Sequence, residues 1–213
     1  MPLPRFEKLD VPRRKTILAA AAAEFGERGF EQASYNRIIE RAGISKGAMY
    51  YYFADKDDLF RTVLDAALQM WLTHVGFPFE ADDAGSYWAA CEAIYGRSLR
   101  FMLTDRDNGA LCLGIIHARA RREQHPALVA LNAQTSEFMQ LAIRQGQQLG
   151  AVRTDIPADL LMESALSLMD AGDRWLAREW DQMEEKRVEE TAAMMVGLFR
   201  RLGEPSNEEH KGS

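Results

Sequence analysis

Charged and hydrogen-bonding side chains gather in one segment of the chain, SYNRIIERAGISKGAMYYYF, which runs from Ser34 to Phe53. Within it, Lys46 and Tyr50 are four residues apart and would share one face of a helix, while Met49 and Phe53 would share another. An ammonium group and a phenol hydroxyl on one face can donate hydrogen bonds to phosphate oxygens and to base edges. The spacing therefore predicts a polar contact face on a helix whose apolar face lies in a core.

Start and stop signals divide this segment into two short helices joined by a tight turn. Ser34 can cap the first helix, Gly43 stands where a left-handed residue ends it, and Ser45 can cap the second. The second helix opens with Lys46-Gly47-Ala48, where small residues leave room for the backbone to approach another molecule. Two helices in this arrangement form a helix-turn-helix, whose second helix can enter the major groove of DNA.

The longer segment GISKGAMYYYFADKDDLF resembles the DNA-binding signature of TetR-type transcriptional regulators. The resemblance extends back through AAAAEFGERGFEQASYNRIIERAG, covers roughly the first 65 residues well, and is looser over the remainder. It implies a sequence-specific regulator of transcription, a repressor released from double-stranded operator DNA by a small, largely apolar ligand. The residues expected at the DNA are Ser34, Tyr35, Asn36, Ser45, Lys46, Gly47, Ala48, Tyr50, Tyr51, Tyr52 and Lys56.

Composition agrees with a protein of the cytoplasm. The 213 residues are 47% apolar and 27% charged, and the two cysteines, Cys91 and Cys112, have no paired spacing, which favours reduced thiols. No apolar run approaches the roughly 18 residues that cross a bilayer, so no membrane partner is expected. The net charge is −6, but residues 1–60 hold ten basic and nine acidic residues, so the acidity lies beyond the expected DNA-binding segment.

Helical periodicity continues along the whole chain and no strand pattern interrupts it, which predicts an all-α fold of about nine helices. The expected helices lie near residues 12–28, 34–42, 46–53, 56–74, 86–103, 110–124, 126–146, 158–180 and 184–202. We expect an N-terminal three-helix DNA-binding domain with a helix-turn-helix at 1–55. A helical bundle for ligand binding and dimerisation would follow at 56–203, and a disordered tail at 204–213.

The last two expected helices carry heptad-like seams, in which apolar residues recur at alternating spacings of four and three. These seams can complete a bundle inside one chain, or they can meet their copies across a two-fold axis. The resemblance favours the second reading, because the TetR family is built around a dimeric four-helix bundle of its last two long helices. The expected homodimer interface is Leu161, Ala165, Leu168, Gly172, Trp175, Val188, Ala192, Met195, Phe199 and Leu202.

Large and adaptable side chains in the middle of the chain have the composition of a small-molecule pocket, and equally that of an ordinary core. The resemblance implies a cavity for an unidentified effector among the middle helices, without saying which side chains face it. An acid on an otherwise apolar helix, such as Asp170 or Asp173, can select a cationic or hydroxylated ligand or can be solvated. The candidates are Trp71, Trp88, Tyr95, Met102, Ile116, Phe138, Met139, Met169, Asp170 and Trp175.

Catalytic and metal-binding patterns are missing from the sequence. It has no phosphate-binding glycine loop, nucleophile elbow or paired metal-binding histidines, and none of its four histidines has a second ligand at metal-site spacing. We therefore expect no catalytic residue, no metal and no cofactor. Two alternatives remain: a dimeric DNA-binding regulator without a small-molecule effector, and an all-helical enzyme or carrier, for which the face from Lys46 to Tyr52 would be buried.

Overall fold

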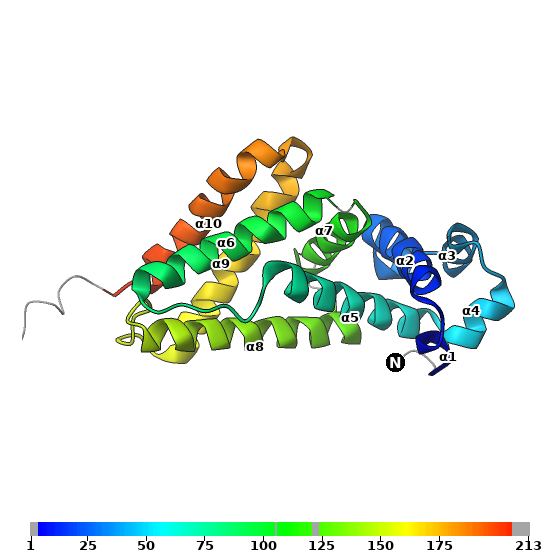
Figure 1. Ribbon diagram of the computed structural model, residues 1–213, viewed down its shortest axis with the longest axis horizontal. Coiled ribbons are helices and arrows are strands. Elements are labelled where there is room, and N and C mark those ends of the chain that lie inside the picture. The colour runs from blue at the N-terminus through cyan, green and yellow to red at the C-terminus, as the bar shows by residue number, and fades with distance from the viewer. Residues whose placement is uncertain (1–3, 105, 121–123, 206–213) are drawn as a thin grey trace, which may run out of the picture. The chain divides into compact units, whose positions relative to one another are not determined.

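The computed structural model describes residues 4–104, 106–120 and 124–205, and all regular structure in these residues is helical (Figure 1). The predicted all-α fold is confirmed. Two short 3₁₀ turns, Trp180–Gln182 and Glu185–Arg187, precede the last helix. The ten α-helices of the described residues are α1 Pro4–Glu7, α2 Val11–Gln32, α3 Tyr35–Ala42, α4 Lys46–Tyr52, α5 Lys56–Val75, α6 Ala84–Thr104, α7 Arg106–Ala120, α8 Pro126–Gln148, α9 Ala158–Glu179 and α10 Val188–Gly203.

Helix ends differ from the expected ones where the backbone conformation decides them. The helix α1 was not expected, which accounts for ten helices in place of nine. The expected end of the first long helix at Gly29 is a kink inside α2, where φ is 70° and ψ is 171°, a region open to glycine, and α2 continues to Gln32. The last helix begins at Val188 and not at Glu184, because Glu184 is extended.

Two of the expectations concern residues outside the described ones. Residues 121–123 of the helix expected at 110–124 lie outside the described residues, as does most of the tail expected at 204–213, which falls on residues 206–213. In the described part of the chain, no helix is both long enough and apolar enough to cross a bilayer.

The chain forms two compact units. The first comprises Met1–Leu72 and Phe101–Leu131, and the second comprises Thr73–Arg100 and Asn132–Ser213. The first unit contains α1 to α4, most of α5, all of α7 and the beginning of α8. It therefore includes more of the chain than the DNA-binding domain predicted at 1–55, and that boundary stays a prediction.

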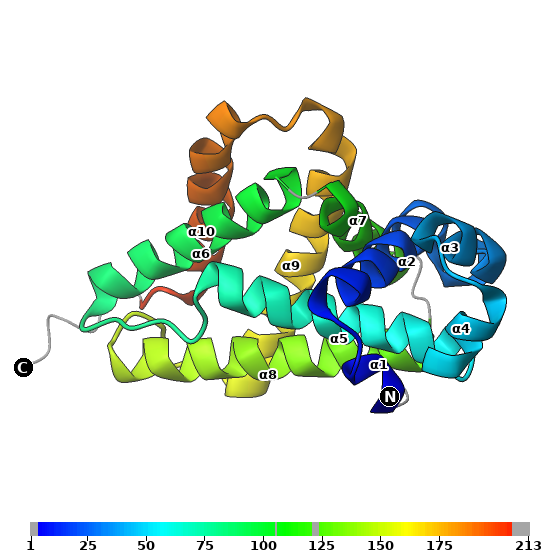
Figure 2. The same ribbon diagram turned by 45° about the vertical axis from the view of Figure 1, so that its right-hand side comes forward.

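The core of the first unit forms around α2, which lies beside α3 (Figure 2). The apolar side chains of α2 are buried in one cluster with those of the helix-turn-helix. Helix α7 packs on α2 through glycines: a Cβ atom added to Gly26 would lie 2.5 Å from the carbonyl carbon and oxygen of Ala110, and one added to Gly114 would lie 2.9 Å from the Cα of Gly26. The two helices can therefore come this close only without side chains at Gly26 and Gly114. The largest fully buried side chains include Ile17, Phe25, Ile38, Met49, Phe53 and Leu59.

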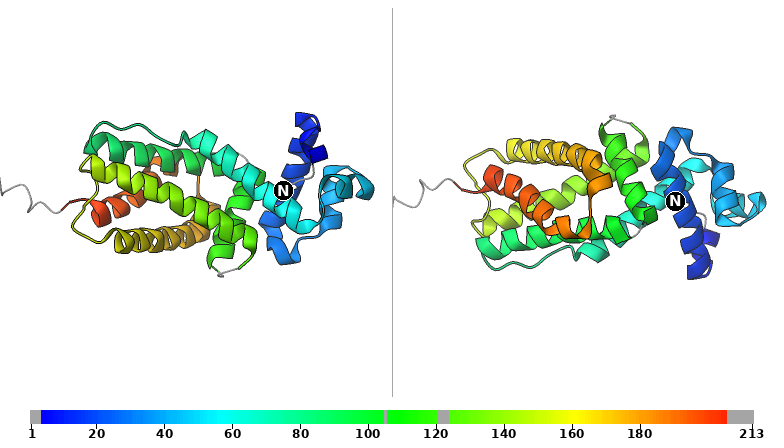
Figure 3. Two further views of the ribbon diagram at one scale, coloured as in Figure 1. Left: turned by 90° about the horizontal axis from the view of Figure 1, so that it is seen from below. Right: turned by 90° about the horizontal axis from the view of Figure 1, so that it is seen from above.

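The second unit contains α9 and α10 together with most of α6 and α8 (Figure 3). The phenol of Tyr87 donates a hydrogen bond to the carbonyl oxygen of Ala142 at 3.0 Å, which ties α6 to α8. Burial raises the pKa of the nearby Cys91 thiol to about 11, so this thiol is protonated at neutral pH, as in a structural cysteine. One buried hydrophobic cluster of this unit is formed by Tyr87, Trp88, Ala151, Val152, Leu161 and Val196.

Candidate DNA-binding site

A buried carboxylate on α2 fixes the start of α3. Glu24 is only 4% exposed, and its Oε1 atom accepts hydrogen bonds from the backbone N–H of Ser34 and from the Nε of Arg37, each at 2.9 Å. A buried carboxylate needs such donors to offset the loss of its hydration. Glu24 therefore holds the N-terminus of the helix-turn-helix against α2, a role that the sequence pattern did not indicate.

The turn between α3 and α4 has the predicted capping. The Oγ of Ser34 accepts from the backbone N–H of Arg37 at 3.3 Å, and the Oγ of Ser45 accepts from that of Ala48 at 3.1 Å. Gly43 is left-handed, with φ 65° and ψ 31°, and the N–H of Ile44 returns to the carbonyl of Ile39 at 3.3 Å, as in a Schellman motif. These caps set the direction in which α4 leaves the turn.

Helix α4 divides into the two faces that the spacing predicted. Met49 and the following Phe53 are 0% exposed, whereas Lys46 and Gly47 are exposed and Tyr50 is 49% exposed. A Cβ atom added to Gly47 would meet only the Oγ of Ser45, at 4.0 Å, so the space above the helix opening is free. The burial of one face is confirmed, and contact of the other face with DNA stays a prediction.

The remaining residues of the predicted contact set differ in accessibility. Asn36 and Tyr51 are exposed, whereas Tyr35, Ala48 and Tyr52 are partly buried. The Tyr35 ring lies 5.4 Å from that of Tyr50, and its hydroxyl is buried without a hydrogen-bond partner among the described residues. Burial, and then the neighbouring Tyr50, raises the pKa of Tyr35, so its phenol stays neutral and keeps a proton to donate.

Lys56 was also expected at the DNA, but its ammonium group forms hydrogen bonds within the protein. Its Nζ donates to three carbonyl oxygens at the end of α2, those of Phe30 at 2.8 Å, Ala33 at 3.3 Å and Glu31 at 3.4 Å. The same atom lies 4.4 Å from the centre of the Phe30 ring. Because an ammonium group has three donors and these carbonyls end a helix, the geometry favours a structural role for Lys56 over a DNA contact.

The helix α1, which was not among the expected helices, lies against α4. The Phe6 side chain is buried, with its ring 4.7 Å from that of Phe53 and 6.2 Å from that of Tyr52. The Arg5 guanidinium carbon lies 4.3 Å above the Tyr51 ring. The one available signal was Phe6 itself, a lone aromatic residue in a short polar segment ahead of the first long helix.

The predicted seam of α9 and α10 is divided between buried and partly buried residues. Leu161, Ala165, Gly172, Val188, Ala192 and Met195 are buried within the single chain, and Leu168, Trp175, Phe199 and Leu202 are partly buried. The buried members pack inside one chain, which is the intramolecular reading of the seam. The large apolar side chains that these two helices leave exposed are Leu160, Met194 and Leu198.

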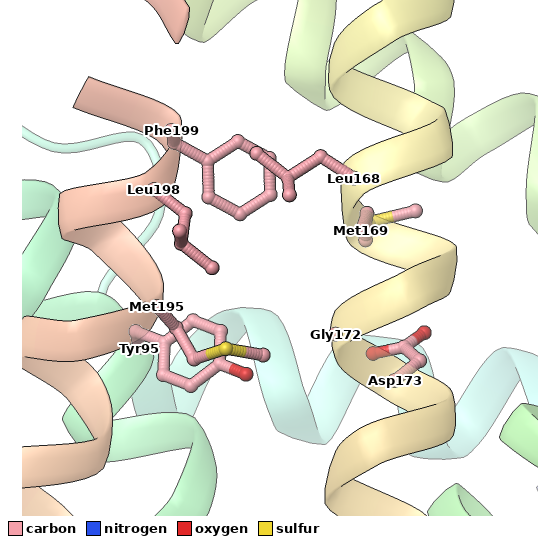
Figure 4. Close-up of a pocket in the computed structure, with 8 residues that line it drawn as sticks. All are labelled: Tyr95, Leu168, Met169, Gly172, Asp173, Met195, Leu198 and Phe199. Carbon is pink, nitrogen blue, oxygen red and sulfur yellow. The ribbon is translucent and has the colours of Figure 1, made fainter. Parts of the chain in front are cut away.

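A small cavity lies among α6, α9 and α10 (Figure 4). Its volume of about 20 Å³ is room for about one water molecule. Of the predicted pocket residues, Tyr95 and Met169 line it, whereas Asp170 is exposed. Asp173, which was outside the predicted set, also lines the cavity. Burial, and then the charge of Asp173, raises the pKa of Tyr95. The other lining residues are Leu168, Gly172, Met195, Leu198 and Phe199.

The other predicted pocket residues lie elsewhere. Trp71, Met102 and Ile116 belong to the first unit, whereas Trp88, Phe138, Met139 and Trp175 belong to the second without lining this cavity. Trp88 packs in the buried core of its unit, and Phe138 packs against Phe77 with 5.3 Å between ring centres.

Comparison with known proteins gives a family match at the N-terminus. Residues 17–63 match the family model described as bacterial regulatory proteins, tetR family. Over 60 residues the chain is 40% identical to the HTH-type transcriptional regulator RutR of Escherichia coli (strain K12), which is 28% of each protein. The chain spans half or less of the length of the curated relatives that it matches.

Solved structures resemble the chain over nearly its whole length. A TetR family transcriptional regulator from Chloroflexus aurantiacus J-10-FL has a TM-score of 0.67 at 18% identity, with 97% of this chain and 100% of that chain covered. The regulator FadR from Bacillus subtilis, in complex with stearoyl-CoA, has a TM-score of 0.68 at 15% identity, with 87% and 96% covered. At these identities the likeness establishes the fold of both units.

Proposed function

The chain belongs to the TetR family of bacterial regulatory proteins, and from this premise we propose that it is a transcriptional regulator that binds operator DNA through α4. The observation that carries this proposal is the division of α4 into a face fixed in the core and a face with exposed Lys46, Gly47 and Tyr50. An enzyme or carrier of this fold would have no need to keep that face accessible.

The proposed contacts follow from the donors that α4 presents. The Lys46 ammonium and the Tyr50 hydroxyl reach phosphates or base edges, and Gly47 lets the helix opening approach the sugar-phosphate backbone closely. Ser34 and Ser45 use their oxygen atoms as caps but keep hydroxyl protons that can be donated to phosphate. Asn36, exposed on α3, is a further donor at this surface.

We further propose a homodimer that places two copies of α4 in successive major grooves, roughly 34–36 Å apart. The proposed interface uses the exposed apolar side chains of α9 and α10, which are Leu160, Met194 and Leu198. The partly buried seam residues would border them. Dimerisation gives the second DNA-binding unit a high effective concentration at its half-site, so two modest contacts produce tight binding.

A ligand-released repressor is the finer form of the proposal. An effector that binds more tightly to the DNA-incompetent state lowers operator affinity by the ratio of its two affinities. The FadR structure of similar fold holds stearoyl-CoA, which supports an effector of the acyl-CoA kind as a first probe. The water-sized cavity would need Met169, Met195 or Leu198 to move before an organic ligand could enter. The alternative is a regulator of the same fold without an effector.

Mobility-shift titration with the DNA upstream of the protein's own gene tests the proposal. We expect saturable binding that weakens steeply with salt, because phosphate contacts release counterions. Tyr50→Phe and Lys46→Ala should both weaken binding without changing the helical content. Parent-like binding by both variants would contradict the assignment of this face. Stearoyl-CoA and shorter acyl-CoA molecules, added to the complex, separate the ligand-released repressor from the regulator without an effector.

A further inference from the structure

Helix α1 is fixed to the DNA-binding helix by a small aromatic cluster. Phe6 is 4% exposed, although α1 has only four residues, because its ring packs on Phe53 and edge-on to Tyr52. Phe53 is itself a fully buried residue at the end of α4. The position of α1 is therefore tied to that of α4 by core packing and not by the short helix alone.

Arg5, the residue before Phe6, places a positive charge beside the exposed face of α4. Arg5 is exposed, and its guanidinium carbon lies 4.3 Å from the centre of the Tyr51 ring, which is itself 50% exposed. A guanidinium over a phenol ring is held by the cation–π interaction while its N–H groups stay available at the edge. Tyr51 thus orients the Arg5 side chain beside the contact face of α4.

The cations around α4 fall into two groups. Arg37 is bound to Glu24, Arg41 lies 3.6 Å from Glu27, and Lys56 donates to backbone carbonyls. By contrast, Arg5, Lys8 and Lys46 have no ion pair or hydrogen bond with the described part of the chain. Residues 4–15 hold five basic and two acidic residues, which is the strongest local excess of positive charge near the helix-turn-helix.

We propose that α1 is a second part of the DNA-binding surface, in which Arg5 contacts a backbone phosphate beside the groove that α4 enters and Tyr51 positions it. This inference rests on the proposed DNA-binding function. The chemistry is that of a planar guanidinium, which binds phosphate with two parallel hydrogen bonds, aided by the positive charge of Lys8. Because a phosphate contact carries no sequence information, Arg5 adds affinity for DNA of any sequence.

The salt dependence of binding tests the role of Arg5. Fluorescence anisotropy would measure the dissociation constant of the full-length protein for the upstream DNA and for an unrelated duplex, at several NaCl concentrations. For Arg5→Ala we expect about tenfold weaker binding to both duplexes at low salt. The slope of the logarithm of the association constant against the logarithm of salt concentration should decrease in magnitude by about two per dimer. Each of the two lost phosphate contacts contributes about 0.9 to that slope. Arg144→Ala, an exposed arginine of the second unit, is the matched control and should keep the parental slope.

Tyr51 variants separate positioning from direct contact. Tyr51→Phe keeps the ring under the guanidinium and should lose less affinity for DNA than Tyr51→Leu. Tyr51→Leu should weaken binding about threefold and leave the thermal midpoint unchanged. An unchanged slope for Arg5→Ala overturns the proposal, and so does a loss confined to the operator, which would place Arg5 on a base edge. Equal losses in Tyr51→Phe and Tyr51→Leu would overturn the positioning role. If the parent protein bound no DNA, the proposed function itself would be wrong, whereas the outcomes above test only the roles of Arg5 and Tyr51.

Discussion

Replacing Lys56 by methionine keeps the length of the apolar stem and removes the ammonium that joins α5 to the end of α2. A hydrogen bond to a charged group contributes roughly 1.5–3 kcal/mol. One of the three bonds is short, at 2.8 Å, and the other two, at 3.3 and 3.4 Å, are weaker. Solvent screens a partly buried group, so we expect Lys56→Met to lower the free energy of unfolding by about 2–3 kcal/mol.

Urea unfolding measures this change, and Lys46→Met is the matched control. With a slope of about 2 kcal/mol per M, the midpoint of the unit that contains Lys56 should fall by about 1–1.5 M urea. Lys46 is exposed and has no partner in the described part of the chain, so its replacement should change stability by less than about 0.5 kcal/mol. The DNA-binding effects should be reversed: Lys46→Met weakens operator binding roughly tenfold, or about 1.4 kcal/mol, whereas folded Lys56→Met binds like the parent.

A Lys56→Met protein that keeps its unfolding midpoint and loses operator binding would contradict the structural role of Lys56. That result would mean that the ammonium leaves the carbonyls of α2 and contacts DNA, as the sequence first indicated. Lys56→Arg adds a second check, because a planar guanidinium cannot point three donors at three converging carbonyl oxygens and should recover only part of the lost stability.

Three further predictions concern other helices. Gly47→Leu should abolish operator binding and leave the melting temperature unchanged or higher, because leucine is the better helix former and meets open space there; unfolding of the variant would show that Gly47 is packed. Gly26→Ala should lower stability by about 1–3 kcal/mol in urea, since its Cβ would overlap the backbone of Ala110, and unchanged stability would mean that α7 is not packed on α2 as described. Met194 lies on the exposed side of α10, so Met194→Glu should sediment as a folded monomer. Met195→Glu instead places a charge in the core and should unfold the protein. A stable Met194→Glu dimer would place the interface elsewhere.

Local signals in the sequence were sufficient for the helix-turn-helix. Ser34, Gly43 and Ser45 act as caps through interactions with residues three to five positions away, so their roles could be predicted without the fold. The four-residue spacing likewise separated Met49 from Lys46 and Tyr50. The kink at Gly29 was expected as an end, because sequence shows the favoured backbone angle of a glycine but not whether a helix resumes after it.

Roles that depend on distant segments could not be read in this way. The carbonyl groups that bind Lys56 lie 23 to 26 residues earlier in the chain. The carboxylate of Glu24 on α2 likewise accepts hydrogen bonds from Ser34 and Arg37, which lie beyond the end of that helix. The seam of α10 follows the heptad spacing, but spacing alone does not tell a partner helix in the same chain from one in a second chain. Which of the predicted pocket residues face an effector stays a prediction for the same reason, since large apolar side chains serve both as core and as pocket lining.

Binding of the parent protein and of Lys46→Ala to the upstream DNA, followed by anisotropy over a range of NaCl concentrations, tests the central claim most directly. We predict specific binding by the parent, with a slope of log K against log salt that reflects several phosphate contacts per dimer. In the variant this slope should be smaller by about two, with the helical content unchanged. Binding that is insensitive to salt, or a variant that is indistinguishable from the parent, would contradict the assignment of α4 as the DNA-binding helix.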